Sequence, residues 1–135
     1  MKTQQEIALS VSDAEIEVLQ QLWQEAPLSA NQIIEVIQRE TGEVVHPKTV
    51  KTLINRLLKK GALSYVERER KYFYSPTIDR NVFYELKTTS FLNKFFDGGL
   101  TPLVSFFSHQ GKLDGNEIAE LKQLIASLEN DNPEE

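Results

Sequence analysis

The 135-residue sequence contains no cysteine, only two histidines and no long apolar run. Without cysteine there can be no disulfide, thiol catalysis or thiolate metal site. Because His46 and His109 are the only histidines, we expect no metal and no cofactor. No segment approaches the ~20 apolar residues of a membrane span, and residues 1–15 lack the hydrophobic region of a signal peptide. We therefore expect no membrane insertion and a cytoplasmic location.

Signatures of catalysis are also missing from the sequence. It has no nucleophile paired with a base, no paired acids in a pocket-forming pattern and no phosphate-cradling glycine loop. His46 precedes Pro47 and is interpreted as a helix-entry residue rather than a general base. We therefore predict that the protein is not an enzyme.

Charge is strongly segregated along the chain. Residues 46–75 carry eight basic and two acidic side chains, although the net charge of the protein is −5. The flanking segments, residues 1–45 and 76–135, are both acidic. A local cationic stripe on an anionic body is typical of a surface that binds polyanions, and a solvated helix face is the alternative. The ordered pattern within the stripe favours nucleic acid.

Two helix starts are marked by capping boxes, in which a serine is followed three residues later by glutamate or glutamine. The pairs are Ser12 with Glu15 and Ser29 with Gln32. Apolar residues at helical spacing follow each start, so both helices should face a core. Trp23 lies in the first apolar stripe and is interpreted as a packing anchor, with a ligand platform as the alternative. Pro27 separates the two helices, and Gly42 should end the second.

A third helix is predicted between Pro47, suited to a first turn, and Gly61, suited to a left-handed end. At 100° per residue, its apolar side consists of Val50, Leu53, Ile54 and Leu57. The opposite side carries residue types that bond base edges and phosphates. Candidates for base and adjacent phosphate contacts are Lys48, Thr49, Lys51 and Thr52, supported by Asn55 and Arg56.

Residues 63–66 and 71–75 are β-prone and predict a hairpin with a charged tip. Because the tip lacks glycine and asparagine, we expect a longer, mobile connection rather than a two-residue turn. The tyrosines Tyr65, Tyr72 and Tyr74 are interpreted mainly as packing residues, with base stacking as the alternative. The candidates for phosphate contact are Arg68, Arg70 and Lys71. Three helices followed by a hairpin predict a mainly α chain with a winged helix-turn-helix DNA-binding domain over residues 8–78.

The sequence from residue 79 onward is rich in phenylalanine and aliphatic residues. A helical segment this short cannot enclose that many large side chains by itself. We therefore expect a second subunit to bury them. Packing against the winged domain is the alternative. The candidate dimerisation residues are Phe83, Leu86, Phe91, Phe95, Leu103, Phe106, Phe107, Ile118, Leu121, Ile125 and Leu128. We expect a helical dimerisation region over residues 79–130, with a last helix capped by Asp114 and Glu117, and flexible termini at 1–7 and 131–135.

Four segments of the sequence stand out together: Ser12-Asp-Ala-Glu15, Ser29-Ala-Asn-Gln-Ile33, the run from Lys48 to Gly61, and Arg70-Lys-Tyr-Phe-Tyr74. They resemble the penicillinase repressor (BlaI/MecI/CopY) family. The resemblance is strong over residues 8–78 and weaker beyond. It implies a homodimeric bacterial transcriptional repressor of genes of the β-lactam-resistance type, with an N-terminal winged helix and a C-terminal helical dimerisation region. Twofold symmetry would then require a roughly palindromic operator of double-stranded DNA.

The resemblance also implies induction through cleavage of the C-terminal region by an inducing protease. The segment that aligns with the cleavage site is Phe106-Phe107, where Phe106 replaces an asparagine found in the best-known members. The copper-responsive branch senses copper with paired cysteines, which this chain lacks. A remaining alternative function is a winged-helix adaptor that contacts protein and not DNA. Weak duplex affinity that is nearly independent of salt would favour the adaptor.

Overall fold

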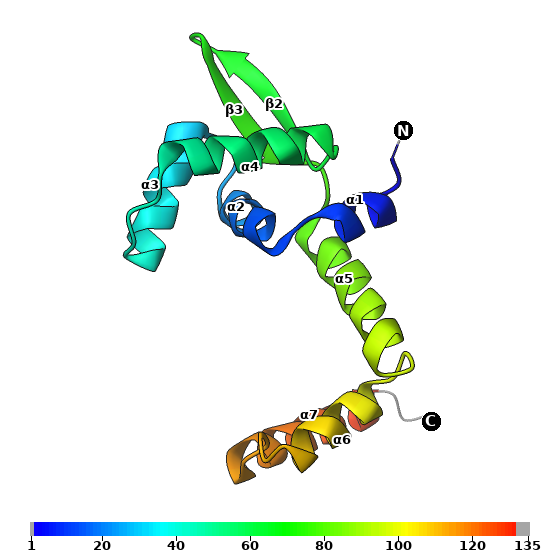
Figure 1. Ribbon diagram of the computed structural model, residues 1–135. Helices are drawn as coiled ribbons and strands as arrows, with labels where there is room; N and C mark the ends of the chain where they lie inside the picture. The colour runs from blue at the N-terminus through cyan, green and yellow to red at the C-terminus, as the bar shows by residue number, and fades with distance from the viewer. Residues whose placement is uncertain (1, 132–135) are drawn as a thin grey trace. The chain divides into compact units, whose positions relative to one another are not determined.

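The computed structural model describes residues 2–131 and divides into two compact units, one ending at Ser90 and the other beginning at Phe91. The chain is mainly α-helical with one small sheet, as the sequence predicted (Figure 1). The first unit contains α1 (Gln4–Ser10), α2 (Asp13–Gln24), α3 (Ala30–Thr41), α4 (Pro47–Lys59), the sheet and the start of α5 (Arg80–Phe95). The second unit contains the end of α5, α6 (Leu100–His109) and α7 (Gly115–Asp131).

Local capping signals start and end the helices of the first unit. In both predicted capping boxes, the serine side chain accepts from a backbone N–H while the partner side chain accepts from the serine N–H. Gly42 and Gly61 have φ values of +72° and +80°, the left-handed conformation that glycine adopts without penalty. His46 is the N-cap of α4, because its Nδ1 accepts from the backbone N–H of Lys48 at 3.2 Å. These predictions of helix ends are confirmed.

The sheet is antiparallel with strand order β1-β3-β2, formed by β1 (Leu28–Ser29), β2 (Leu63–Arg68) and β3 (Lys71–Pro76). Arg68 pairs with Lys71, which leaves only Glu69 and Arg70 in the connection. Both residues have positive φ, 51° and 66°. The expectation of a longer, mobile tip is therefore wrong. A pair of positive φ values suits the twist of the two strands, and the paired strands outweigh a cost of roughly 1–2 kcal/mol per non-glycine residue.

The first unit has one continuous hydrophobic core. The buried side of α4 consists of Val50, Ile54 and Leu57, as its periodicity predicted. Trp23 packs against Phe83 with ring centroids 5.2 Å apart, and its Nε1 donates to the carbonyl of Ile78 at 2.9 Å. Trp23 is therefore a packing anchor, and it ties α2 to the segment that leads into α5.

The first unit is larger than the winged domain expected from sequence. Residues 1–7 were expected to be a flexible terminus, but α1 begins at Gln4 and buries Ile7 and Ala8 in the core. Thr3 is the N-cap of this helix, because its hydroxyl oxygen accepts a hydrogen bond from the backbone N–H of Glu6. The sequence reasoning overlooked this capping residue. The expected flexible residues 1 and 132–135 lie outside the described residues. The unit extends to Ser90 because the first turns of α5 insert Phe83 into the same core.

The second unit has no buried residue within its described part, residues 91–131. Its internal contacts include a pair of rings, Phe96 and Phe106, with centroids 5.7 Å apart. The last helix starts as predicted, because the side chain of Asp114 accepts from the backbone N–H of Glu117 at 2.8 Å. Among the described residues, no helix combines the length and apolar character needed to cross a bilayer.

Candidate nucleic-acid interface

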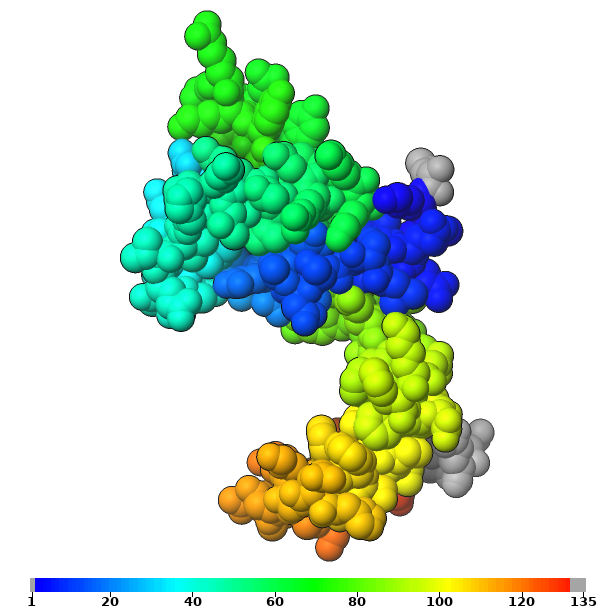
Figure 2. All heavy atoms as spheres, in the orientation of Figure 1, coloured from blue at the N-terminus to red at the C-terminus, as the bar shows by residue number. Residues whose placement is uncertain are grey.

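The exposed side of α4 and the adjacent hairpin form the candidate interface. Figure 2 shows α4 and the hairpin next to each other on one face of the first unit. All nine residues proposed from sequence for DNA contact are solvent-exposed: Lys48, Thr49, Lys51, Thr52, Asn55, Arg56, Arg68, Arg70 and Lys71. Because the buried stripe of α4 points into the core, the six of them that belong to α4 occupy its outer face, and the other three belong to the hairpin.

The cations on this face are not neutralised by carboxylates. Within residues 2–131, the single ion pair joins Lys60 to Glu15. Lys60 therefore takes no part in the exposed stripe, although it contributed to the charge count of the sequence. The other lysines and arginines of α4 and the wing remain available to phosphate, which a polyanion-binding surface requires.

The N-terminal end of α4 borders a surface hollow lined by His46, Lys48, Thr49 and Thr52. The Thr52 hydroxyl donates to the carbonyl of Lys48 at 2.9 Å, so its oxygen remains free to accept from a base N–H. His46 uses Nδ1 in the helix cap, which leaves Nε2 as its remaining hydrogen-bonding atom. Sequence reasoning did not assign His46 to the interface. Its position at a helix N-terminus could have indicated such a role, because backbone N–H groups and the helix dipole favour a phosphate there.

The wing combines exposed cations with an exposed pair of rings. Arg68 and Lys71 face each other across the hairpin, and Arg70 occupies the turn. Tyr65 and Tyr72 are about half exposed, with ring centroids 4.6 Å apart, whereas Tyr74 is buried. Burial raises the pKa of the Tyr74 hydroxyl, and the neighbouring Tyr72 and Tyr65 add to the effect. Of the three tyrosines interpreted as packing residues, Tyr74 therefore lies in the core, while Tyr65 and Tyr72 pack on each other at the exposed surface of the wing.

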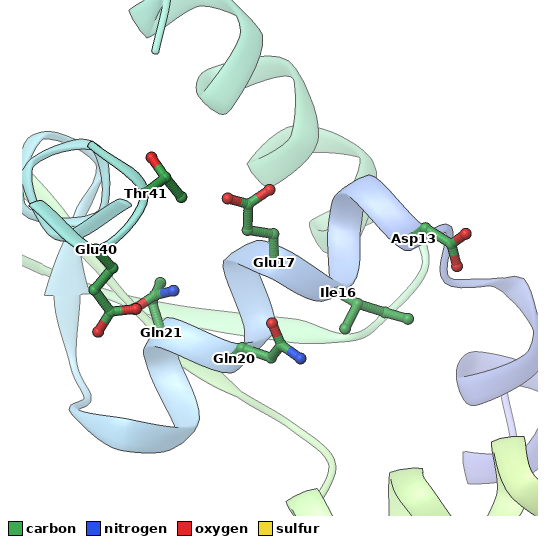
Figure 3. Close-up of a pocket in the computed structure, with 7 residues that line it drawn as sticks. All are labelled: Asp13, Ile16, Glu17, Gln20, Gln21, Glu40 and Thr41. Atoms are coloured by element: carbon green, nitrogen blue, oxygen red, sulfur yellow. The ribbon is translucent and has the colours of Figure 1, made fainter. Parts of the chain in front are cut away.

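A different surface of the same unit is acidic. Figure 3 shows a hollow between α2 and the end of α3 that is lined by Asp13, Glu17 and Glu40, together with Ile16, Gln20, Gln21 and Thr41. Carboxylates repel phosphate, so this surface opposes contact with a polyanion. Among the residues that the structure describes, no cluster of histidine and carboxylate side chains could hold a metal ion.

The candidate dimerisation residues divide into two groups. Phe83 is only 1% exposed within a single chain, so its assignment to a subunit interface is wrong, because it is already enclosed by the core of the first unit. Leu86 is partly buried against the same core, and Leu103 and Leu121 are also partly buried. The remaining candidates are exposed: Phe91, Phe95, Phe106, Phe107, Ile118, Ile125 and Leu128. Sequence reasoning missed two further exposed residues, Leu100 and Leu124. The signal for Leu124 was its place in the helical spacing of Leu121, Ile125 and Leu128.

The helices α2, α3 and α4 are followed by a wing, and the outer face of α4 is cationic and unneutralised within the described residues. This arrangement defines a nucleic-acid-binding protein of the winged-helix class. The family model described as penicillinase repressor matches residues 11–127. The chain belongs to this family of transcriptional repressors, which are not enzymes. The resemblance found in the sequence is therefore confirmed.

Similar proteins cover nearly the whole chain. The penicillinase repressor of Bacillus licheniformis is 37% identical over 120 residues, which are 89% of this chain and 92% of that protein. The methicillin resistance regulatory protein MecI of Staphylococcus aureus is 34% identical over 115 residues, 85% of this chain and 92% of that protein. The apo crystal structure of wild-type MarR from E. coli superimposes with a TM-score of 0.53 at 15% identity, covering 89% of this chain and 79% of that one. This last likeness concerns the fold alone.

Proposed function

We propose that this protein is a transcriptional repressor that binds double-stranded operator DNA as a homodimer and occludes a bacterial promoter in the cytoplasm. The observation that carries the proposal is the outer face of α4, where exposed cations lie beside threonine and asparagine with no acidic partner among the described residues. The relatives of the chain support it, because they are named as a penicillinase repressor and a methicillin resistance regulatory protein. The protein has no catalytic role in this proposal.

The N-terminal half of α4 reads the operator from the major groove. Lys48, Thr49, Lys51 and Thr52 contact base edges and adjacent phosphates, with Asn55 and Arg56 in support. This is the part of a recognition helix that normally meets the bases. Arg68, Arg70 and Lys71 of the wing contact the phosphate backbone, since long exposed cations on a hairpin supply attraction without sequence information.

The second unit holds two copies of the chain together. Its aromatic and aliphatic side chains are exposed in the single chain, up to 67% for Phe95 and 64% for Leu100. Covering a large side chain gains about 1.5–3 kcal/mol, so a second copy would recover several kcal/mol from this unit. Two recognition helices related by a twofold axis would meet half-sites spaced by about one turn of duplex or a small multiple of it. Tethering then increases affinity by roughly 10² to 10⁴ through effective concentration.

The regulated genes are of the β-lactam-resistance type, by analogy with the names of the relatives. Induction proceeds by cleavage between Phe106 and Phe107, two exposed residues of α6. Because a protease binds its substrate in an extended conformation, α6 must unwind locally before the cut. Cleavage separates α7 from the rest of the chain, which removes part of the dimerisation surface and releases the operator.

A salt titration tests whether this surface binds DNA. Fluorescence anisotropy should give a duplex affinity that falls steeply as salt rises, with a slope of about −0.9 for each phosphate contact. Lys51→Met should weaken binding, whereas Lys122→Met, an exposed lysine of α7, should not. Weak affinity that is nearly independent of salt would contradict the proposal and favour a protein-binding adaptor.

A further inference from the structure

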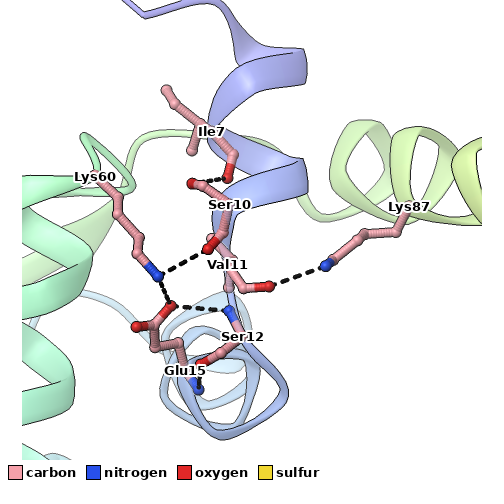
Figure 4. Close-up of polar contacts among 7 residues, drawn as sticks. All are labelled: Ile7, Ser10, Val11, Ser12, Glu15, Lys60 and Lys87. Carbon is pink, nitrogen blue, oxygen red and sulfur yellow. Dashed lines mark hydrogen bonds and ion pairs between the residues drawn. The ribbon is translucent and has the colours of Figure 1, made fainter.

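Two lysines that are distant in sequence bind the short turn between α1 and α2 (Figure 4). Lys60, which follows α4, donates from Nζ to the carbonyl of Ser10 at 2.7 Å and to Oε1 of Glu15 at 2.5 Å. Lys87 of α5 donates from Nζ to the carbonyl of Val11 at 2.9 Å. Two ammonium groups from different helices therefore bind the carbonyls of adjacent residues.

The Glu15 carboxylate fixes the first of these contacts. The same Oε1 that accepts from Lys60 also accepts from the backbone N–H of Ser12 at 2.9 Å. The side chain of Glu15 is 1% exposed and that of Lys60 is 26% exposed. Burial raises the pKa of Glu15, but the hydrogen bonds and charge of Lys60 and the bonds from Ser12 lower it by more. Charge-assisted hydrogen bonds of this kind are short and directional, so they hold one geometry.

An apolar contact reinforces the attachment of α4, and buried apolar side chains surround the attachment of α5. Gly61 has no Cβ, but a Cβ placed on its backbone would lie 3.7 Å from Cδ1 of Ile7, which is van der Waals contact distance. Ile7 of α1 therefore lies close against the turn that ends α4. The Lys87 ammonium lies 5.9 Å from the ring centroid of the buried Phe83, and Val11 is also buried. The end of α4 and the first half of α5 are thus attached to the same turn, Ser10 to Ser12.

The attachment at Lys60 lies at the opposite end of α4 from the proposed base contacts. At about 1.5 Å per residue, the helix axis runs ~18 Å from Lys48 to Lys60. A tilt of about 5° at Lys60 would displace Lys48 by roughly 1.6 Å over that length. Hydrogen bonds to base edges require donor–acceptor distances of about 2.7–3.2 Å, so such a displacement would break them. Phosphate attraction by a flexible lysine tolerates the same displacement.

We infer that Glu15, Lys60 and Lys87 are positioning residues for operator recognition. They do not touch DNA themselves. They hold the recognition helix and α5 to one another through the turn Ser10 to Ser12. Because α5 continues to Phe95, the same turn links α4 to the helix that leads into the second unit. This inference rests on the proposed function.

The first test uses a paired substitution in the full chain, Glu15→Gln with Lys60→Met. Replacing both partners avoids the buried unpaired charge that a single substitution would leave. The dissociation constant is measured for the operator, obtained by selection from random duplexes, and for a scrambled duplex, each over a series of salt concentrations. We expect the dissociation constant for the operator to rise roughly tenfold, which corresponds to the loss of about one good base contact. The dissociation constant for the scrambled duplex should stay within about twofold of the wild-type value. The salt slope should not change.

The second test addresses Lys87, which has no carboxylate partner among the described residues. Lys87→Met should weaken operator binding by about three- to tenfold with an unchanged salt slope. Lys112→Met removes an exposed lysine outside the junction and serves as the matched control, which should bind like the wild type. Lys60→Arg and Lys87→Arg keep a donor and a positive charge, so each should bind within about threefold of the wild type.

Three results would overturn the inference. Equal losses on operator and scrambled duplex would indicate a general loss of folded protein, which thermal melting of each variant checks separately. A smaller salt slope would mean that the lysine contacts phosphate directly. Unchanged operator affinity would mean that the junction has no part in recognition. A wild-type protein that does not prefer any duplex would instead defeat the proposed function, so the two failures are distinguishable.

Discussion

The two units of this protein differ in how far their apolar side chains are buried. The first unit encloses a core that runs from Ile7 to Phe83, with several side chains fully removed from solvent. The second unit has long, well-formed helices but buries none of its described residues. Large apolar side chains remain exposed on α5, α6 and α7. The apolar content of the second unit is therefore available for contact with another molecule, whereas that of the first unit is already used for folding.

The comparison also separates two kinds of charge. In the first unit, Lys60 is bound to a buried carboxylate and stabilises the fold, while the lysines on the outer face of α4 have no acidic partner in the described part of the chain. Neighbouring residues of one sequence run thus serve different purposes. A charge count alone does not distinguish them.

The largest expected effect comes from the second unit. Ile125→Glu with Leu128→Glu places charges on exposed apolar positions of α7, so dimerisation should be lost because a buried unpaired charge is costly. Operator affinity should fall by about 10²- to 10⁴-fold. Sedimentation equilibrium and anisotropy measure the two quantities. A wild-type protein that is monomeric at all concentrations would contradict the proposal that the second unit mediates dimerisation.

A phenylalanine truncation in each unit sharpens the contrast. Phe83→Ala should lower the free energy of unfolding of the first unit by about 3–5 kcal/mol, because it creates a cavity in a closed core. Phe107→Ala removes a ring that is 43% exposed, so it should leave the unfolding of the first unit unchanged while weakening the dimer. Urea denaturation followed by the fluorescence of Trp23 reports on the first unit. Similar losses for both variants in that signal would be inconsistent with separate units.

Substitutions within the interface should separate base contacts from phosphate contacts. Lys51→Met in α4 should cost about 1–3 kcal/mol on the operator if the lysine contacts a base edge, and relax sequence preference at one position. Lys71→Met in the wing should weaken all duplexes alike and reduce the salt slope by about one unit. Both quantities come from anisotropy titrations. Identical behaviour on operator and scrambled duplexes would contradict this division of roles.

Substitutions in the turn of the wing should have smaller effects, raising stability while lowering affinity for DNA. Glu69→Asn with Arg70→Gly supplies residues suited to two positive φ values, so the first unit should be stabilised by up to about 1 kcal/mol. The same change removes the Arg70 cation and the Glu69 carboxylate, so the net charge of the tip is unchanged. Duplex binding should still weaken, because the proposed phosphate contact of Arg70 is lost. Thermal melting and anisotropy measure the two effects, and Arg70→Lys is the control that keeps the charge. A loss of stability would mean that the turn geometry is not a source of strain.

The smallest expected effect is the pH dependence of the Glu15 contact. The folded pKa of Glu15 lies below its ordinary value of 4.5, because the bonds from Lys60 and Ser12 outweigh the effect of burial. Its contribution to stability is therefore complete above that value and is lost as pH falls through the folded pKa. The difference in unfolding free energy between the wild type and Glu15→Gln should be constant near neutral pH and shrink below about pH 4.5.

Local signals in the sequence predicted most of the first unit. The serine caps, Pro47, Gly61 and the apolar stripe of α4 act within a few residues, so one sequence is enough to locate the helices. The exposed residues of α4 were also predictable, since periodicity alone assigns them to the outer face. The same reasoning identified an excess of apolar residues in the second unit.

Features that depend on distant contacts were not predictable. The two-residue turn of the wing is held by the pairing of whole strands, although Glu69 and Arg70 carry no signal for it. Lys60 looked like one more surface cation, but its partners are Ser10 and Glu15, far back in the sequence. Phe83 looked like the exposed residues that follow it, but it is buried in the core of the first unit, where Trp23 packs against its ring.

Selection of duplexes from a random pool by the full-length protein tests the central proposal most directly. The account predicts enrichment of one motif with twofold symmetry, whose half-sites are separated by about one turn of duplex or a small multiple of it. Lys51→Met should relax the preference at one position of each half-site, whereas Lys122→Met should retain the full motif. Failure of the wild-type protein to enrich any motif, at salt concentrations where it still binds duplex, would contradict sequence-specific recognition by α4.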